Sequence, residues 1–329
     1  MLSQENLIHS LPTLRHEKTT VIRPWVRSRA PGTFGELVQG KLGATPFLIT
    51  LPINRFSYAQ IYPSETQTKN SQGLVKCERL IGEFTRLLGL KKNFEFKITS
   101  SLPHGKGLAS SSADIVALGS AILTKIGIGA PFQAELICKA AKSIEPTDGI
   151  MYPGIVAFAH HRVRILKNLG FLKMKVIGVL EEGTVDTIDY DSKSCLYRSD
   201  ETDGFMKALS TVEEGLRRGS VDQIGSASTR SAEINQRFLP KKSFTKFTQI
   251  QKHLNLPGIV VAHSGTAIGL LISGSTPEIE ITKIRTEVEN RTGLRTAVYE
   301  TFRDGPTAVN HIASVYKHQS KELEASFSN

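Results

Sequence analysis

The spacing of hydrophobic and polar side chains changes several times along the chain, and each change predicts an element. Residues 94–98 alternate between apolar and charged side chains, which is the pattern of a half-buried strand. The segment that begins at Ser112 instead places apolar side chains three or four positions apart, as one face of a helix does. A stretch rich in glycine and serine separates the two. The chain therefore predicts a strand, a polar loop and a helix in direct succession.

Other apolar runs predict further elements on both sides of this unit. Pro131 stands at a favoured first helical position, and Pro146 ends the helix that it opens. Leu80–Leu90 predicts a helix that ends at Gly89 or just beyond it. Because strands and helices do not alternate strictly, the expected fold class is α+β rather than a doubly wound sheet. Short apolar runs predict strands at residues 47–51, 56–61, 171–180, 259–262 and 269–273.

The length of 329 residues allows two domains or one large bilobal domain. Residues 1–29 are polar and show no sustained periodicity, which indicates an N-terminal extension ahead of the folded body. No apolar run approaches the roughly 20 residues that a membrane helix needs. The start of the chain also lacks the apolar core of a signal peptide. These features favour a cytoplasmic protein with no membrane partner.

Lysine and arginine outnumber aspartate and glutamate by 41 to 31, and the formal net charge of +10 favours anionic partners. Nucleic acid and a phosphorylated small molecule both fit that charge. The basic residues are scattered and are not interleaved with aromatic ones as in an RNA-binding strand, so a solvated basic face is the simplest interpretation. Cys77, Cys138 and Cys195 have neither disulfide nor zinc-ligand spacing, which is typical of free thiols in a reducing compartment.

The polar loop at residues 103–114 is the most informative segment of the chain. Its glycines let the backbone approach a ligand closely, and the helix that follows directs free N–H groups toward that ligand. Lys106 adds a positive charge, and three consecutive serines add hydroxyl groups. Together these features favour a bound anion, for which phosphate is the usual example. The loop is not a P-loop, because Gly107 follows the lysine, and it lacks the patterns of a dinucleotide loop and a nucleophile elbow.

This loop resembles the second motif of the GHMP kinase superfamily, which has the form P-x3-G-L-x-S-S-x-A. Every fixed position matches, namely Pro103, Gly107, Leu108, Ser110, Ser111 and Ala113. The resemblance implies that ATP binds here with its phosphates against the loop. The cofactor-binding residues that it implies are Pro103, Gly105, Lys106, Gly107, Leu108, Ala109, Ser110, Ser111 and Ser112.

Two further segments resemble motifs of the same superfamily. Residues 30–40 keep the Pro-Gly pair of the first motif but have Thr33 where many members carry lysine, and they end in GELVQG. Residues 262–269 form a glycine-containing loop between two predicted strands. The GELxQG ending and the AHSGT stretch both resemble the L-threonine kinase branch of cobamide (vitamin B12) side-chain synthesis. The substrate-binding residues that this implies are Glu36, Gln39, Asp148, Ser264, Gly265 and Thr266.

Glu145 closes the helix predicted to start at Pro131, and Asp148 lies in the loop just beyond it. A carboxylate there faces the negative end of the helix dipole, a conflict that a bound cation would remove. The resemblance implies that Glu145 and Ser111 hold Mg²⁺, and that Asp148, Glu145 and Ser111 are catalytic. Asp148 would accept the proton of the substrate hydroxyl or bind the substrate ammonium group. An ordinary polar turn in which Asp148 caps the backbone is the simpler alternative.

The resemblance implies an ATP-binding α+β domain at residues 30–170, a ferredoxin-like domain at residues 171–329, and an active site between them. It also implies an ATP- and Mg²⁺-dependent kinase that converts L-threonine to O-phospho-L-threonine for cobamide synthesis, with no nucleic-acid partner. L-Serine, L-homoserine or another small hydroxylated acceptor stays open, because a pocket discriminates one methyl group by only about 1–3 kcal/mol. A basic nucleic-acid-binding protein and a catalytically weakened sensor are the alternatives from other classes.

Overall fold

A computed structural model describes residues 25–64, 74–90, 93–184 and 197–309 of the chain. The strands in these ranges are β1 (Val26–Leu42), β2 (Thr45–Ser64), β3 (Asn93–Ser100), β4 (Ile155–Ala159), β5 (Arg164–Gly170), β6 (Met174–Leu180), β7 (Gly258–Val261), β8 (Ala267–Ser273), β9 (Ala297–Glu300) and β10 (Thr307–Val309). The helices are α2 (Val75–Leu88), α3 (Ser110–Lys125), α4 (Ala130–Ala141), α6 (Ser199–Arg218), α7 (Val221–Asn235), α8 (Phe244–His253) and α9 (Glu278–Thr292).

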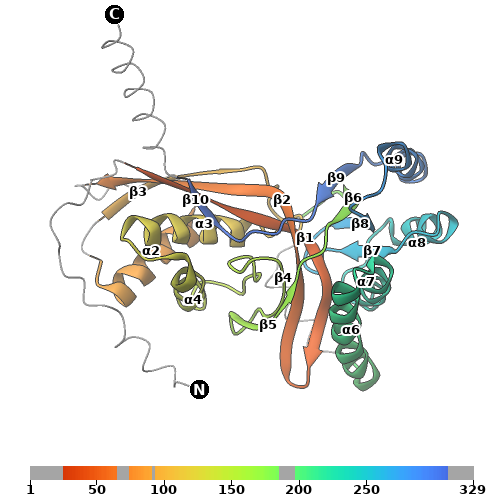
Figure 1. Ribbon diagram of the computed structural model, residues 1–329, viewed down its shortest axis with the longest axis horizontal. Helices are drawn as coiled ribbons and strands as arrows, with labels where there is room; N and C mark the ends of the chain where they lie inside the picture. Colours follow the sequence, from red (N-terminus) through yellow and green to blue (C-terminus); the bar gives the residue numbers. More distant parts are fainter. Residues whose placement is uncertain (1–24, 65–73, 91–92, 185–196, 310–329) are drawn as a thin grey trace, which may run out of the picture.

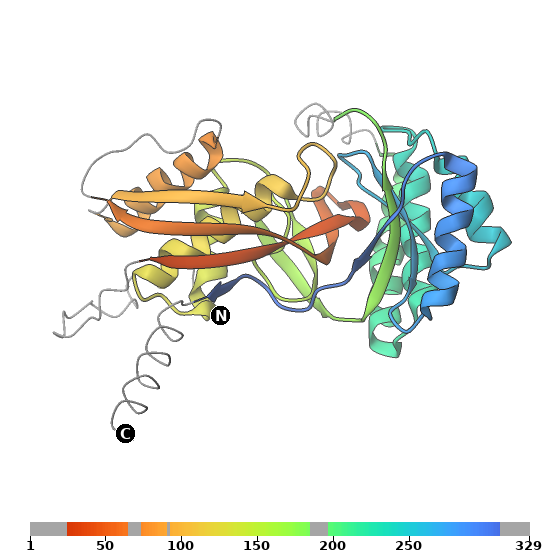
Figure 2. The ribbon, with the colours of Figure 1, turned by 90° about the horizontal axis from the view of Figure 1, so that it is seen from above.

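All ten strands belong to one sheet, in the order β5-β4-β2-β1-β7-β8-β6-β9, while β10 pairs with β1 and β3 pairs with β2. Helices α2, α3 and α4 lie at one end of the molecule, and α6 to α9 lie at the other (Figures 1 and 2). The mixture of an extended sheet with helices grouped at two ends is an α+β fold, which confirms the expected class.

The long hairpin of β1 and β2 organises the end that contains α3. Helix α3 contacts both strands and is also flanked by α2 and α4. Its residues 112–123 are all buried, so a helix of small and apolar side chains fits where a charged face would not. Asp114 is the exception, and its carboxylate accepts a hydrogen bond of 2.5 Å from the Ser57 hydroxyl on β2. The predicted strand at residues 94–98 is β3, on the other edge of β2.

The other end has the strand order β9-β6-β8-β7 with antiparallel pairing throughout. Along the chain these four strands are interrupted by helices as strand, helices, strand, strand, helix, strand. That order is the ferredoxin-like arrangement, and it confirms the fold expected for the C-terminal part. The division of the chain into domains after residue 170 stays a prediction.

The two ends are joined through β1. Glu36 of β1 pairs with Val261 of β7, at a place where the register of β1 against β2 shifts. Next to it, Phe34 packs against Gly178 and Gly269, where any added Cβ would lie within 3 Å of its ring. One hydrophobic core therefore extends across the join, because residues from both ends bury their side chains in it.

Three expectations about the elements differ from the structure. Residues 26–29 belong to β1 rather than to an N-terminal extension, because Val26 and Ser28 are buried and the segment pairs with β2 and β10. The runs at residues 47–51 and 56–61 form one strand, β2, because the irregular pairing with β1 accommodates Pro52. The helix that starts near Pro131 ends at Ala141, so Glu145 lies in the turn after it.

Cys77 and Cys138 are buried free thiols, and burial raises the pKa of Cys77 to about 12 and that of Cys138 to about 11. Both are therefore protonated and unreactive at neutral pH. Cys195 lies outside the described residues. Among the helices described, none combines the length and the apolar character needed to cross a membrane.

Candidate active site

Three segments that are far apart in the sequence meet at the start of α3. The N–H groups of Thr33 and Gly35 on β1 donate to the carbonyls of Leu108 and Gly107, both at 3.2 Å. The N–H groups of Thr266 and Ala267 donate to the carbonyl of Lys106, both at 3.1 Å. The three segments singled out in the sequence therefore form one unit, held together by backbone hydrogen bonds.

Glycine is required where these segments touch. Gly107 has a φ of +79°, and a Cβ there would lie 2.2 Å from the Cβ of Ala262. A Cβ at Gly265 would lie 2.4 Å from the backbone of Gly107, and one at Gly35 would lie 2.2 Å from the carbonyl oxygen of Val261. Real Cβ atoms do not approach so closely, so these glycines permit the backbones to pack directly on one another.

The N-terminus of α3 opens directly from this unit. Its N-cap, Ala109, has a φ of +55°, and no side chain caps the first turn. The first N–H groups of a helix have no partner within the helix, and together with the dipole they attract an anion. The Ser110 hydroxyl lies 3.3 Å from Nδ1 of His104, inside the same loop. The first turn of α3 therefore has the features of a phosphate-binding site.

Ser111 and Glu145 place two oxygen ligands side by side. The Ser111 hydroxyl donates to Oε1 of Glu145 at 2.6 Å, and Oε2 of Glu145 forms an ion pair with Lys76. Hydroxyl and carboxylate oxygens suit Mg²⁺, which usually takes one or two protein ligands and completes its shell with water and phosphate. Among residues 25–64, 74–90, 93–184 and 197–309, no cluster of three acidic, histidine or cysteine side chains could hold a metal alone. The pair thus fits Mg²⁺ bound together with a nucleotide.

Asp148 contacts the next residue of α3. The Ser112 hydroxyl donates to Oδ2 of Asp148 at 3.2 Å, and the N–H of Asp148 lies 3.3 Å from the same hydroxyl. Removal of the carboxyl from bulk water, and secondarily the negative charge of Glu36, raise the pKa of Asp148 to about 7. A carboxylate with a pKa near neutrality can take up a proton from a substrate hydroxyl.

Glu36 is held by a chain of hydrogen bonds from the opposite side. Its Oε2 accepts from the backbone N–H of His263 at 2.9 Å and lies 3.0 Å from Nδ1 of the same residue. Nε2 of His263 lies 2.9 Å from the hydroxyl of Ser231 on α7, and that hydroxyl accepts from the N–H of Gln39 at 3.0 Å. All four residues are buried, so the position of Glu36 is fixed by β1, α7 and the β7–β8 loop together.

Three threonine hydroxyls in these segments have no partner. Within the described ranges, the Oγ1 atoms of Thr33, Thr147 and Thr266 are buried and make no hydrogen bond. A buried hydroxyl without a partner costs about 1–3 kcal/mol, so groups of this kind mark places where a ligand or water belongs. One of the three lies in each of the β1 segment, the loop that contains Asp148, and the β7–β8 loop.

A hollow of about 170 Å³ lies elsewhere, lined by Arg27, Tyr58, Gln60, Lys97 and Thr99 on β1, β2 and β3. It contains no carboxylate and none of the glycine loops. We therefore assign the candidate site to the start of α3.

The chain is similar to known proteins over most of its length. Residues 74–156 match the model of the GHMP kinases N terminal domain. The L-threonine kinase of Citrobacter freundii is 26% identical over 264 residues, which cover 78% of this chain and 89% of that protein. The L-threonine kinase of Salmonella typhimurium strain LT2 is 27% identical over 259 residues, which cover 77% of this chain and 84% of that protein.

Residues 74–156 therefore form a GHMP kinases N terminal domain, and the chain is of the GHMP kinase type. It is a kinase, a phosphotransferase with a hydroxyl group as acceptor. Solved structures agree on the fold: a homoserine kinase from Cytophaga hutchinsonii superimposes with a TM-score of 0.70 at 14% identity, covering 89% of this chain and all of that one. Another, described as MDDEF in complex with MVAPP, AMPPCP and magnesium, has a TM-score of 0.66 at 13% identity, covering 87% of this chain and 99% of that one.

The structure of this GHMP kinase brings most of the predicted site residues together. Gly105, Gly107, Leu108 and Ala109 form the loop, and the three serines form the first turn of α3, with Pro103 exposed at the loop's start. Gly265 and Thr266 contact that loop from the β7–β8 side, and Ser264 lies half-buried beside them. Gln39 reaches the neighbouring Ser231 with its backbone groups.

The position of Lys106 in the loop predicts that its ammonium group binds phosphate, but in the structure this group contacts backbone carbonyls. Its ammonium group donates to the carbonyls of Glu181 at 2.7 Å and Gly183 at 2.6 Å, so it ties the loop to the end of β6. Its role as a phosphate ligand stays a prediction.

Several residues at this site carried no sequence signal. Ser231 and Lys76 come from helices without any motif, and only the fold brings them to Glu36 and Glu145. Thr33 and Thr147 stand inside segments that the motifs mark, but only the fold shows that their hydroxyl groups are buried at the site. His263 is buried and supports Glu36 through both its backbone N–H and its imidazole.

Proposed function

We propose that this GHMP kinase transfers the γ-phosphoryl group of ATP to the side-chain hydroxyl of L-threonine. The observation that carries the proposal is the arrangement at the start of α3. The N-terminus of this helix has no side-chain cap, Ser111 contacts the carboxylate of Glu145, and the next residue, Ser112, contacts the carboxylate of Asp148. The identity of about a quarter with two L-threonine kinases over more than three quarters of the chain supports the acceptor.

In this proposal the loop before α3 binds the phosphates of ATP. The N–H groups of the first turn donate to phosphate oxygens, and the glycines keep the approach clear of side chains. Ser111 and Glu145 are the residues that would hold Mg²⁺, which neutralises charge on the phosphates when bound. Lys76 keeps the Glu145 carboxylate oriented toward Ser111 through their shared ion pair.

Asp148 acts on the acceptor. Its carboxylate accepts the hydroxyl proton while the hydroxyl oxygen forms a bond to the γ-phosphorus and the bond to the β–γ bridging oxygen breaks. The products are O-phospho-L-threonine and ADP. Glu36, held by His263, provides a fixed negative charge for the ammonium group of the amino acid. Phosphoryl transfer needs mainly such positioning and charge neutralisation.

The chemistry of the product suggests its use. O-Phospho-L-threonine yields aminopropanol phosphate on loss of its carboxyl group, and that compound is the one needed for cobamide side chains. The proposal therefore includes a place in cobamide synthesis, as the resemblance to the L-threonine kinase branch implies.

The test is ATP consumption by the purified protein with Mg²⁺ against L-threonine, L-serine, L-homoserine and water, with the product identified by phosphorus NMR. We expect turnover that depends on L-threonine and yields one phosphomonoester. Turnover with L-serine or L-homoserine alone would keep the kinase and exclude the L-threonine assignment. No turnover with any of these acceptors, despite ATP binding, would overturn the proposed acceptor class.

A further inference from the structure

Lys241 is a buried cation that the proposed mechanism does not yet use. It lies in the connection between α7 and α8, and its residue is 5% exposed. In the part of the chain that the structure describes, its ammonium group has one hydrogen-bond partner, the carbonyl of Leu239 at 3.3 Å, and forms no ion pair. An ammonium group has three donors, so two of them are available to a ligand.

The surroundings of Lys241 connect it to the site. Glu36 and Glu181 are close enough for their charges to act on its ammonium group, while burial, the larger effect, lowers the pKa of Lys241 to about 8. The N–H of Glu181 donates to the carbonyl of Thr266 at 3.1 Å, and its carbonyl accepts from Lys106. Since the carboxylate of Glu181 also accepts from the two backbone N–H groups that follow Lys241, the connection that contains Lys241 adjoins both glycine loops.

The backbone around Lys241 is held at several points. The carboxylate of Glu181 accepts from the N–H groups of Lys242 at 3.1 Å and Ser243 at 2.7 Å. The side-chain oxygen of Gln236 accepts from the N–H of Lys241 at 2.7 Å. A ligand would thus meet an ammonium group on a fixed backbone rather than on a loose loop.

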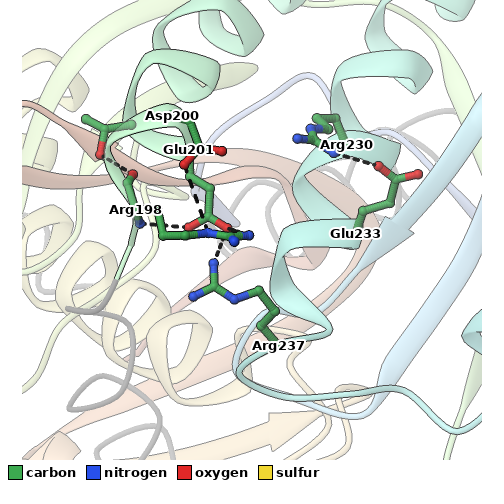
Figure 3. Close-up of polar contacts among 7 residues, drawn as sticks. Arg198, Asp200, Glu201, Arg230, Glu233 and Arg237 are labelled. Carbon is green, nitrogen blue, oxygen red and sulfur yellow. Dashed lines mark hydrogen bonds and ion pairs between the residues drawn. The ribbon is translucent and has the colours of Figure 1, made fainter.

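The start of the same connection is tied to α6. Arg237 forms an ion pair with the buried carboxylate of Glu201, which also accepts from the guanidinium of Arg198 at 3.2 Å and from its N–H at 2.9 Å (Figure 3). Arg230 pairs separately with Glu233 on α7. These contacts lock the end of α7 against the start of α6, four residues before Lys241.

The other lysines next to the site are already engaged. Lys76 pairs with Glu145, and Lys106 donates to two carbonyls. An amino acid presents an ammonium group and a carboxylate, so a site needs opposite charges for the two. Glu36 provides the negative charge, and Lys241, within reach of its field, provides the positive one.

We propose that Lys241 binds the α-carboxylate of the acceptor and makes this kinase selective for amino acids over amino alcohols and amides. The inference rests on the proposed function, because it takes the acceptor to be a hydroxy amino acid. It assigns Lys241 to substrate binding and not to the transfer of the phosphoryl group.

The experiment compares L-threonine with L-threoninamide, which keeps the hydroxyl and ammonium groups and lacks the carboxylate. For the wild-type enzyme we expect KM to be about 10- to 100-fold lower for L-threonine, the range for a hydrogen bond between charged groups. Lys241→Met should raise the KM for L-threonine by about the same factor and leave the KM for L-threoninamide and kcat within twofold. Lys241→Arg should recover part of the affinity for L-threonine. The exposed neighbour gives the matched control, Lys242→Met, which should behave as wild type.

The outcomes separate this inference from the proposed function. An equal loss with both acceptors in Lys241→Met, or a loss confined to kcat, would overturn carboxylate binding even though L-threonine is phosphorylated. If the wild-type enzyme prefers another hydroxy acid, the proposed acceptor fails, and the same comparison with that acid and its amide decides the role of Lys241. If Lys241→Met does not fold, an equal KM of wild-type enzyme for acid and amide would overturn the inference.

Discussion

The loop before α3 and the cluster around Glu36 hold their groups in place by different means. The loop is a contiguous stretch of about ten residues whose contacts are made by backbone atoms and glycine. The cluster joins Glu36 to His263 and Gln39 to Ser231, residues separated by 227 and 192 positions in the sequence, and each of its contacts needs a particular side chain on at least one partner. A site built from backbone groups can be encoded by one short segment of sequence. A site built from side chains depends on where distant elements of the fold meet.

The largest effect is expected from Gly107→Ala, which tests the backbone contacts of the loop. The new Cβ would occupy left-handed backbone and collide with Ala262, so we expect a loss of about 2–5 kcal/mol in the free energy of unfolding, together with loss of activity. Gly43→Ala is the matched control, because its φ is +58° but nothing lies within 4 Å. Urea denaturation measures both, and equal losses in the two variants would refute the steric argument.

The next effect concerns the oxygen pair at the start of α3. Glu145→Gln removes a charge from the pair with Ser111, and we expect kcat to fall by about 10²- to 10³-fold with a higher requirement for Mg²⁺. Glu135→Gln on α4 removes a carboxylate of a surface pair and should stay within twofold of wild type. Steady-state kinetics across a magnesium titration give the measurement, and wild-type kcat in Glu145→Gln would exclude Glu145 from the reaction.

A smaller effect should separate the Glu36 cluster from the loop. Ser231→Ala removes the hydroxyl between Gln39 and His263, and we expect the KM for the amino acid to rise about five- to tenfold with the KM for ATP unchanged. Ser228→Ala is the control on the same helix, because its buried hydroxyl donates to the carbonyl of Ile259 at 2.8 Å, away from Glu36. Both variants should lose similar stability in thermal unfolding. Equal kinetics in the two would show that Ser231 has no role beyond packing.

The last prediction is a pH dependence from Asp148. A base is active only when ionised, and burial raises the pKa of Asp148 to about 7, so kcat/KM should rise with pH by up to tenfold per unit below that value. Asp148→Asn should lower kcat/KM and remove the rise between pH 5 and 7.5. A wild-type profile that is flat over this range would argue against Asp148 as the proton acceptor.

Much of the fold could be predicted from local pattern. The helix after the serine run, the end of α2 at Gly89 and the half-buried strand β3 all follow from periodicity and capping, which act over a few residues. The single strand β2 could not be predicted, because Pro52 resembles a break until the bulged pairing with β1 is known. The strand at residues 26–29 was missed for a similar reason, since its partners are β2 and the distant β10.

The sequence by itself determined that a glycine and serine loop opens a helix and that two carboxylates stand at the end of the following helix and just beyond it. Those features depend on backbone conformation and spacing over short distances, so residues 103–112, Glu145 and Asp148 could be selected in advance. Only the tertiary structure decided that Ser231 supports Glu36 through His263, that Lys76 pairs with Glu145, and that Lys241 is buried with unused donors. A side chain on an ordinary helix or connection acquires such a role from the partners that packing brings to it, and no local pattern records those partners.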